Sequence, residues 1–151
     1  MNERLALWGV LLAAGMLPPE EYRQELHEAF LDAPDNADLL ELEQCTRDLK
    51  ETVALLRAPR PADEGRFCAM LFAHLEDYYR KTSDSASGIS VQMADVWRAL
   101  PEFVNPLLEP FYTLHYLGDS LPPFGSEARM RTLLEEAFAL ARTKGEKFHE
   151  L

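Results

Sequence analysis

From Phe67 to Leu75 the chain is apolar at every position except His74. The stretch contains no Val, Ile or Thr, is rich in Ala, Leu and Met, and runs on into charged residues. This composition favours a helix over a buried strand. A helix that is apolar all round needs other helices around it. We therefore predict that a helix over 66–81 forms the centre of a helical bundle.

Most of the remaining chain shows the amphipathic spacing of helices that pack on one face. Prolines at 106 and 110 predict kinks or two short helices over 101–117. A helix after residue 126 is expected to end at Gly145. We predict an all-α, single-domain bundle of about seven helices over residues 1–151. The expected helices outside the centre span 2–14, 19–33, 35–58, 90–100 and 126–144.

The charge balance limits the classes of partner. There are 26 Asp and Glu against 15 Lys and Arg, a net charge of −11. This excess disfavours binding to nucleic acid or to an anionic membrane surface. The apolar segment 5–17 is too short to span a bilayer and lacks the basic leader of a signal peptide. Two cysteines without a CxxC motif fit a reducing compartment, so we expect a cytoplasmic protein.

The acidic residues concentrate near the N-terminus. Between Glu20 and Glu51 there are eleven acids and three bases, a net charge of −8. One interpretation is a solvated face that keeps the protein soluble; the other is a surface for a partner. Four of these acids follow helical spacing, and like charges at that spacing destabilise a helix. The predicted partner-binding residues are Glu21, Glu25, Glu28, Asp32, Asp35, Asp38, Glu41 and Asp48.

The leading functional hypothesis is a small acidic binding protein that engages a basic protein partner through this N-terminal face. An immunity-like or antitoxin-like inhibitor would fit, because the substrate groove of a nuclease is basic and an acidic surface can occlude it. An adaptor subunit would use the same surface. The oligomeric state does not follow from the sequence.

The alternative hypothesis is a small helical enzyme or ligand binder with a pocket in the aromatic region 97–124. Aromatic residues are common at binding sites, but they also fill irregular space between kinked helices. The residues predicted to line this pocket are His74, Trp97, Tyr112, His115 and Tyr116.

The motifs of catalysis and metal binding are weak. The chain has no Gly-x-Ser-x-Gly elbow, phosphate-binding loop or dinucleotide glycine motif. Glu146 and His149 have the Glu-x-x-His spacing of di-iron bundles, which require two such motifs and further glutamates. His74 is better explained as a hydrogen-bonded core histidine, and Cys68 as a small buried hydrophobe. We expect no metal, no cofactor and a binding protein more than an enzyme.

Overall fold

The computed structural model describes the backbone of residues 1–150 and the side chains of residues 1–145. Within residues 1–150 every regular element is helical, which confirms the predicted all-α bundle. The elements are α1 (Asn2–Ala13), α2 (Pro19–Asp32), α3 (Ala37–Gln44), α4 (Leu49–Leu56), α5 (Glu64–Lys81), α6 (Ala86–Arg98), α7 (Phe111–Tyr116), the 3₁₀ helix η1 (Leu117–Ser120) and α8 (Glu127–Glu150).

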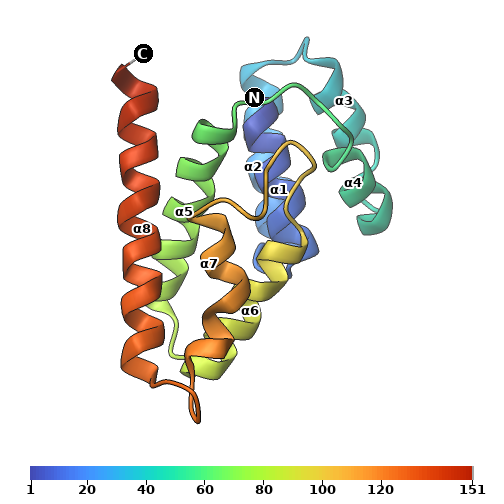
Figure 1. The fold of residues 1–151 in the computed structure, drawn as a ribbon. Coiled ribbons are helices and arrows are strands. Elements are labelled where there is room, and N and C mark those ends of the chain that lie inside the picture. The colour runs from blue at the N-terminus through green and yellow to red at the C-terminus, as the bar shows by residue number, and fades with distance from the viewer. Residues whose placement is uncertain (151) are drawn as a thin grey trace.

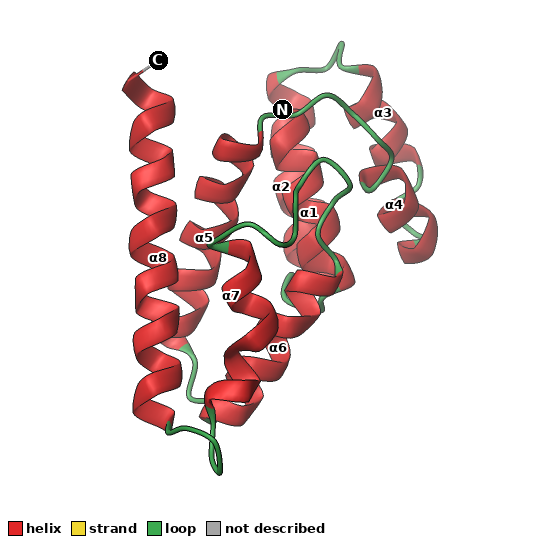
Figure 2. Cartoon of the chain, in the orientation of Figure 1, coloured by secondary structure: helices red, strands yellow, loops and turns green. Residues whose placement is uncertain are grey.

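The helices form one bundle with two distinct flanks (Figure 1). The long helix α8 lies on one flank, and the short helices α3 and α4 lie on the other. Helices α5 and α1 lie between them, while α6 and α7 cover the lower front of the view. Figure 2 shows two long loops near α1: the 57–63 loop runs over its upper end to α5, and the 99–110 loop lies in front of it.

Helix α5 lies at the centre of the bundle and packs on both α1 and α8. Its buried residues include Phe67, Leu71 and Leu75, at the spacing of one helical face. Phe72 meets Phe111 of α7 edge-on, with ring centroids 5.7 Å apart. The opposite side of α5 packs on α8, the most extensive helix pair in the fold. The prediction of a helix without any solvent face is wrong in one respect, because Ala73 is exposed.

Helices α1 and α4 approach each other closely at Gly9. A Cβ atom at Gly9 would lie 3.2 Å from both Leu56 Cβ and Arg57 Cγ. A larger side chain at this position would push α4 away from α1. Glycine therefore fixes the approach that brings the end of α4 next to the start of the chain.

The predicted helix over 35–58 is wrong in its continuity, because residues 45–48 form a turn between α3 and α4. The Asp48 side chain accepts a hydrogen bond from the Glu51 amide at 3.1 Å and starts α4 as its N-cap. The buried Thr52 hydroxyl donates to the Cys45 carbonyl at 3.0 Å, which holds the turn closed. At the start of α3 the N-cap is Asn36, which accepts from the Leu39 amide.

Three further boundaries differ from the prediction. Helix α6 begins at Ala86, since Ser85 caps it by accepting from the Gly88 amide at 3.1 Å. Residues 101–110 form turns, and only Phe111–Tyr116 is helical in that segment. Helix α8 continues through Gly145, where a Cβ atom would lie 3.1 Å from Ala69 Cβ. This glycine permits close packing on α5 and does not end the helix.

Candidate functional site

The acidic residues predicted to bind a partner lie on α2, on α3, and in the two segments before α3 and α4. Six of the eight are exposed: Glu21, Glu28, Asp32, Asp35, Glu41 and Asp48. Glu25 and Asp38 are partly buried.

Three of these eight carboxylates have structural roles. Glu25 accepts a hydrogen bond from the indole N–H of Trp8 at 2.7 Å, and Trp8 is only 2% exposed. Asp38 lies 3.5 Å from Arg60 Nε in an ion pair, and Asp48 caps α4. Glu25 and Asp38 are therefore not free to the same extent as the exposed acids of the segment.

The other five carboxylates have neither a hydrogen bond nor an ion pair with any side chain in residues 1–145. They are Glu21, Glu28, Asp32, Asp35 and Glu41. The exposed bases of the same segment, Arg23, Arg47 and Lys50, do not neutralise them through ion pairs among the described side chains. The segment therefore presents unneutralised negative charge to solvent.

Exposed leucines accompany these charges. Leu31 on α2 is 63% exposed, and Leu40 on α3 is 45% exposed. Leu49, the first residue of α4, is 47% exposed. An isolated exposed leucine is ordinary for a soluble protein. Leu31 and Leu40 directly precede the free carboxylates of Asp32 and Glu41 in the sequence.

Four of the five residues predicted to line a pocket lie together between α6 and α7. The Trp97 and His115 rings stack with centroids 4.1 Å apart, and the Trp97 indole N–H donates to the Pro106 carbonyl at 3.0 Å. Tyr112 contacts both His115 and Tyr116 through its ring. These rings pack against one another, and Tyr116 also lines a depression of about 240 Å³ between α7 and α8.

His74 does not join this aromatic group, because it lies on α5. It is partly buried and makes no hydrogen bond within residues 1–145, so the prediction of a hydrogen-bonded core histidine is wrong. Asp77, one turn further along α5, pairs with Lys81 at 2.9 Å.

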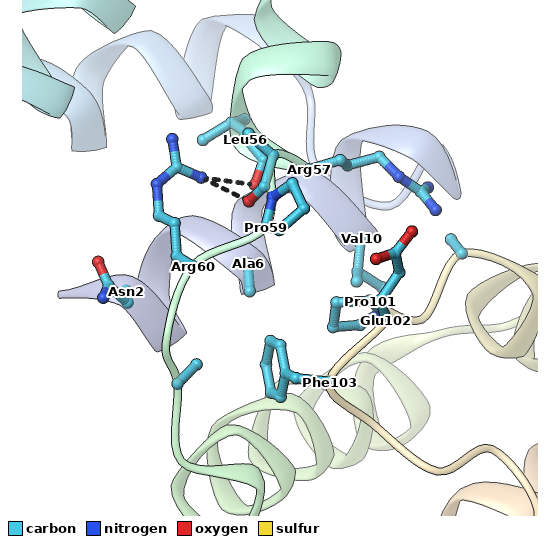
Figure 3. Close-up of a pocket in the computed structure, with 13 residues that line it drawn as sticks. Asn2, Ala6, Val10, Leu56, Arg57, Pro59, Arg60, Pro101, Glu102 and Phe103 are labelled. Carbon is cyan, nitrogen blue, oxygen red and sulfur yellow. Dashed lines mark hydrogen bonds between the residues drawn. The ribbon is translucent and has the colours of Figure 1, made fainter.

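A pocket that the sequence did not predict lies where the two long loops lie against α1 (Figure 3). It has a volume of about 270 Å³. Its apolar lining comes from three distant parts of the chain: Ala6 and Val10 of α1, Leu56 at the end of α4 with Pro59 just after it, and Phe103 of the 99–110 loop. The only signal in the sequence is the proline-rich segment 58–63, which predicts a stiff linker but no cavity.

The charged groups around this pocket are balanced. Arg60 donates to the backbone carbonyls of Leu55 and Leu56 at 2.9 and 3.2 Å, which satisfies the C-terminal end of α4. Its Nε atom faces Asp38, as described above. Figure 3 shows Arg57 and Glu102 reaching toward each other at one end of the pocket. Two bases and one acid therefore line the pocket, and a second acid, Asp38, pairs with one of the bases from outside it.

The thiols do not form a reactive centre. Burial raises the pKa of the Cys68 thiol to about 11, so at neutral pH this group is protonated and a poor nucleophile. Cys68 is 0% exposed, which agrees with the prediction of a small buried hydrophobe. Cys45 is a free, partly buried thiol that contributes its carbonyl to the turn before α4.

Among residues 1–145 no group of three or more His, Cys, Asp or Glu side chains is placed to hold a metal ion. The predicted Glu146 and His149 pair lies outside the described side chains. None of the helices within the described part of the chain has the length and apolar character needed to cross a membrane.

Comparisons of the chain with protein-family models, with curated proteins and with solved structures found no match. No relative therefore indicates its function.

Proposed function

We propose that this protein is a binding protein that engages a basic protein partner through the acidic segment 20–51, which comprises α2, α3 and the start of α4. The observation that carries the proposal is the set of five exposed carboxylates without a partner in the described chain. Glu28 and Asp32 are one helical turn apart on α2 and represent this set.

Unpaired like charges on one segment lower the stability of the folded chain, because they repel each other. Carboxylates at i and i+4 repel each other by a few tenths of a kcal/mol on a helix. An opposite charge on a partner relieves this repulsion and accelerates encounter by roughly 10- to 1000-fold. Such a surface contributes mainly to the association rate and to the choice of partner.

The partner class that fits best is a protein with a basic groove, such as a nuclease or a toxin that acts on nucleic acid. An acidic protein that covers such a groove excludes the polyanionic substrate. Inhibition of that kind makes an immunity-like or antitoxin-like role the leading form of the proposal. An adaptor that recruits a basic subunit is the second form.

The test uses charge reversal on the face and a matched reversal elsewhere. E28K/D32K changes the face, and D119K/E136K changes exposed acids of η1 and α8 that lack partners among the described side chains. Each pair of reversals moves the net charge from −11 to −7, because two charges of −1 become +1. The partner is captured from the source lysate with the wild-type protein and identified, and association rates are then measured at low and high salt.

We expect a basic captured protein and an association rate at low salt that falls about tenfold or more in E28K/D32K but much less in D119K/E136K. The difference should shrink at high salt, where screening is strong. An acidic partner, or equal association rates for the two variants, would mean that the acidic segment serves only to keep the protein soluble.

A further inference from the structure

The 270 Å³ pocket between α1, the end of α4 with the segment after it, and the 99–110 loop is a feature that the acidic face does not explain. Its interior is apolar, with Ala6, Val10 and Phe103 among the lining side chains. The volume lies just below the roughly 300–1000 Å³ typical of pockets for drug-sized ligands. It suits one bulky side chain better than a nucleotide or a large cofactor.

The three charged residues that line the pocket, Arg57, Arg60 and Glu102, do not select a charged occupant. Arg60 donates to three backbone carbonyls and forms an ion pair with Asp38. Arg57 and Glu102 have opposite signs and lie at the same end of the pocket (Figure 3). With the charges balanced, an occupant gains mainly from burying apolar surface.

One ion pair links the pocket to the acidic segment. Asp38 belongs to that segment, and its carboxylate lies 3.5 Å from Nε of Arg60, a residue that lines the pocket. Asp35, one of the five free carboxylates, lies three residues before Asp38. A partner that contacts Asp38 would therefore lie next to Arg60 and the pocket that Arg60 lines.

We propose that this pocket receives one bulky apolar side chain, of the phenylalanine class, from the basic partner. The inference rests on the proposed function and assigns the acidic segment and the pocket different roles in binding. The acidic segment sets the association rate, and the pocket provides a desolvated anchor of the kind that dominates interface energetics and slows dissociation.

Two capped nine-residue peptides represent the partner, each with eight lysines and a central Phe or Ala. Nine extended residues span about 30 Å, so the lysines can reach the acidic segment while the central residue enters the pocket. Binding to the full-length protein is measured by fluorescence anisotropy at two salt concentrations. We expect the Phe peptide to bind about tenfold tighter than the Ala peptide, as burial of a phenylalanine predicts.

Filling the pocket should remove this preference. Ala6→Leu introduces a larger side chain at the pocket wall, and Ala139→Leu is the matched change at an exposed alanine of α8. Ala62→Phe fills the pocket from the linker and replaces the first variant if Ala6→Leu unfolds by circular dichroism. We expect the tenfold preference in wild type and Ala139→Leu, and less than twofold preference in the filled variants.

Each remaining outcome refutes a specific statement. Salt-dependent binding of both peptides with equal affinity would refute the anchor and leave the acidic face in place. Binding of neither peptide, or binding insensitive to salt, would contradict the proposed function itself. N-acetylphenylalanine amide is the small-molecule control. If it binds as tightly as the Phe peptide, the pocket is a small-ligand site and the anchor proposal is wrong.

Discussion

Glu25 shows how a single residue can belong to a surface pattern and still serve the core. The spacing of acids along 21–32 correctly predicts that Glu25 lies on a helix beside other carboxylates. The spacing cannot reveal that the indole N–H of Trp8, seventeen positions earlier, points at its carboxylate across the packed helices. A contact between two helices depends on their crossing, which periodicity within one helix does not encode.

This contact predicts unequal costs for two neighbouring acids. Glu25→Ala leaves the N–H of a Trp8 side chain that is 2% exposed without its acceptor, and should lower the free energy of unfolding by about 1–3 kcal/mol. Glu25→Gln keeps an acceptor oxygen and should lower it less. Glu28→Ala removes an exposed side chain without a partner among the described ones, and should change it by about 0.5 kcal/mol or less. Urea unfolding of the three variants measures this order; equal losses for Glu25→Ala and Glu28→Ala would mean that Glu25 is only a surface charge.

The turn between α3 and α4 shows what the hydrophobic pattern misses at the scale of an element. Apolar positions continue at helical spacing through the turn, so the pattern predicts one helix. The break comes from polar contacts, namely the Asp48 cap and the bond from the Thr52 hydroxyl to the Cys45 carbonyl. Caps compete with helix continuation, and a single Asp within an amphipathic stretch is ambiguous between the two.

The same distinction separates two of the predicted partner-binding acids. Asp48→Ala removes the N-cap of α4 and should cost about 0.5–2 kcal/mol of stability. Asp35→Ala removes an exposed carboxylate beside α3, whose N-cap is Asn36, and should leave stability nearly unchanged. Circular dichroism with urea unfolding measures both variants. A larger loss in Asp35→Ala than in Asp48→Ala would show that the capping residues are wrongly assigned.

Helix α8 is held on α5 by charge as well as by packing. Arg80 of α5 donates to Glu76 and Glu135, and Arg142 also donates to Glu76. The hydrogen bond from Arg80 lowers the pKa of the Glu135 carboxyl. The amphipathic pattern of α8 predicts its buried face, but it does not identify α5 as the neighbour or Gly145 as a packing position. Those depend on which helices meet, which the sequence leaves open.

For the whole molecule, the sequence predicts the class of fold and the location of its charge. It does not predict the pocket, because the pocket is formed by residues near 6, 59 and 103, which no local pattern connects. Four of the five residues predicted to form a pocket do lie together, but as packed rings. Aromatic composition thus indicated a cluster correctly, while the cavity depends on where the two loops lie against α1.

The net charge of −11 predicts how the whole molecule responds to salt. Repulsion among the acids acts over a screening length of about 30 Å at 0.01 M salt and about 3 Å at 1 M, whereas most exposed ion pairs contribute only about 0–1 kcal/mol each. We therefore expect the free energy of unfolding in urea to rise between 10 mM and 1 M sodium chloride. The rise should be largest for the wild type, smaller for D119K/E136K and smallest for E28K/D32K, which relieves repulsion at the acidic segment itself. A fall of stability with salt in all three proteins would show that attraction within ion pairs, such as Arg80 with Glu135, outweighs the repulsion of the acidic segment.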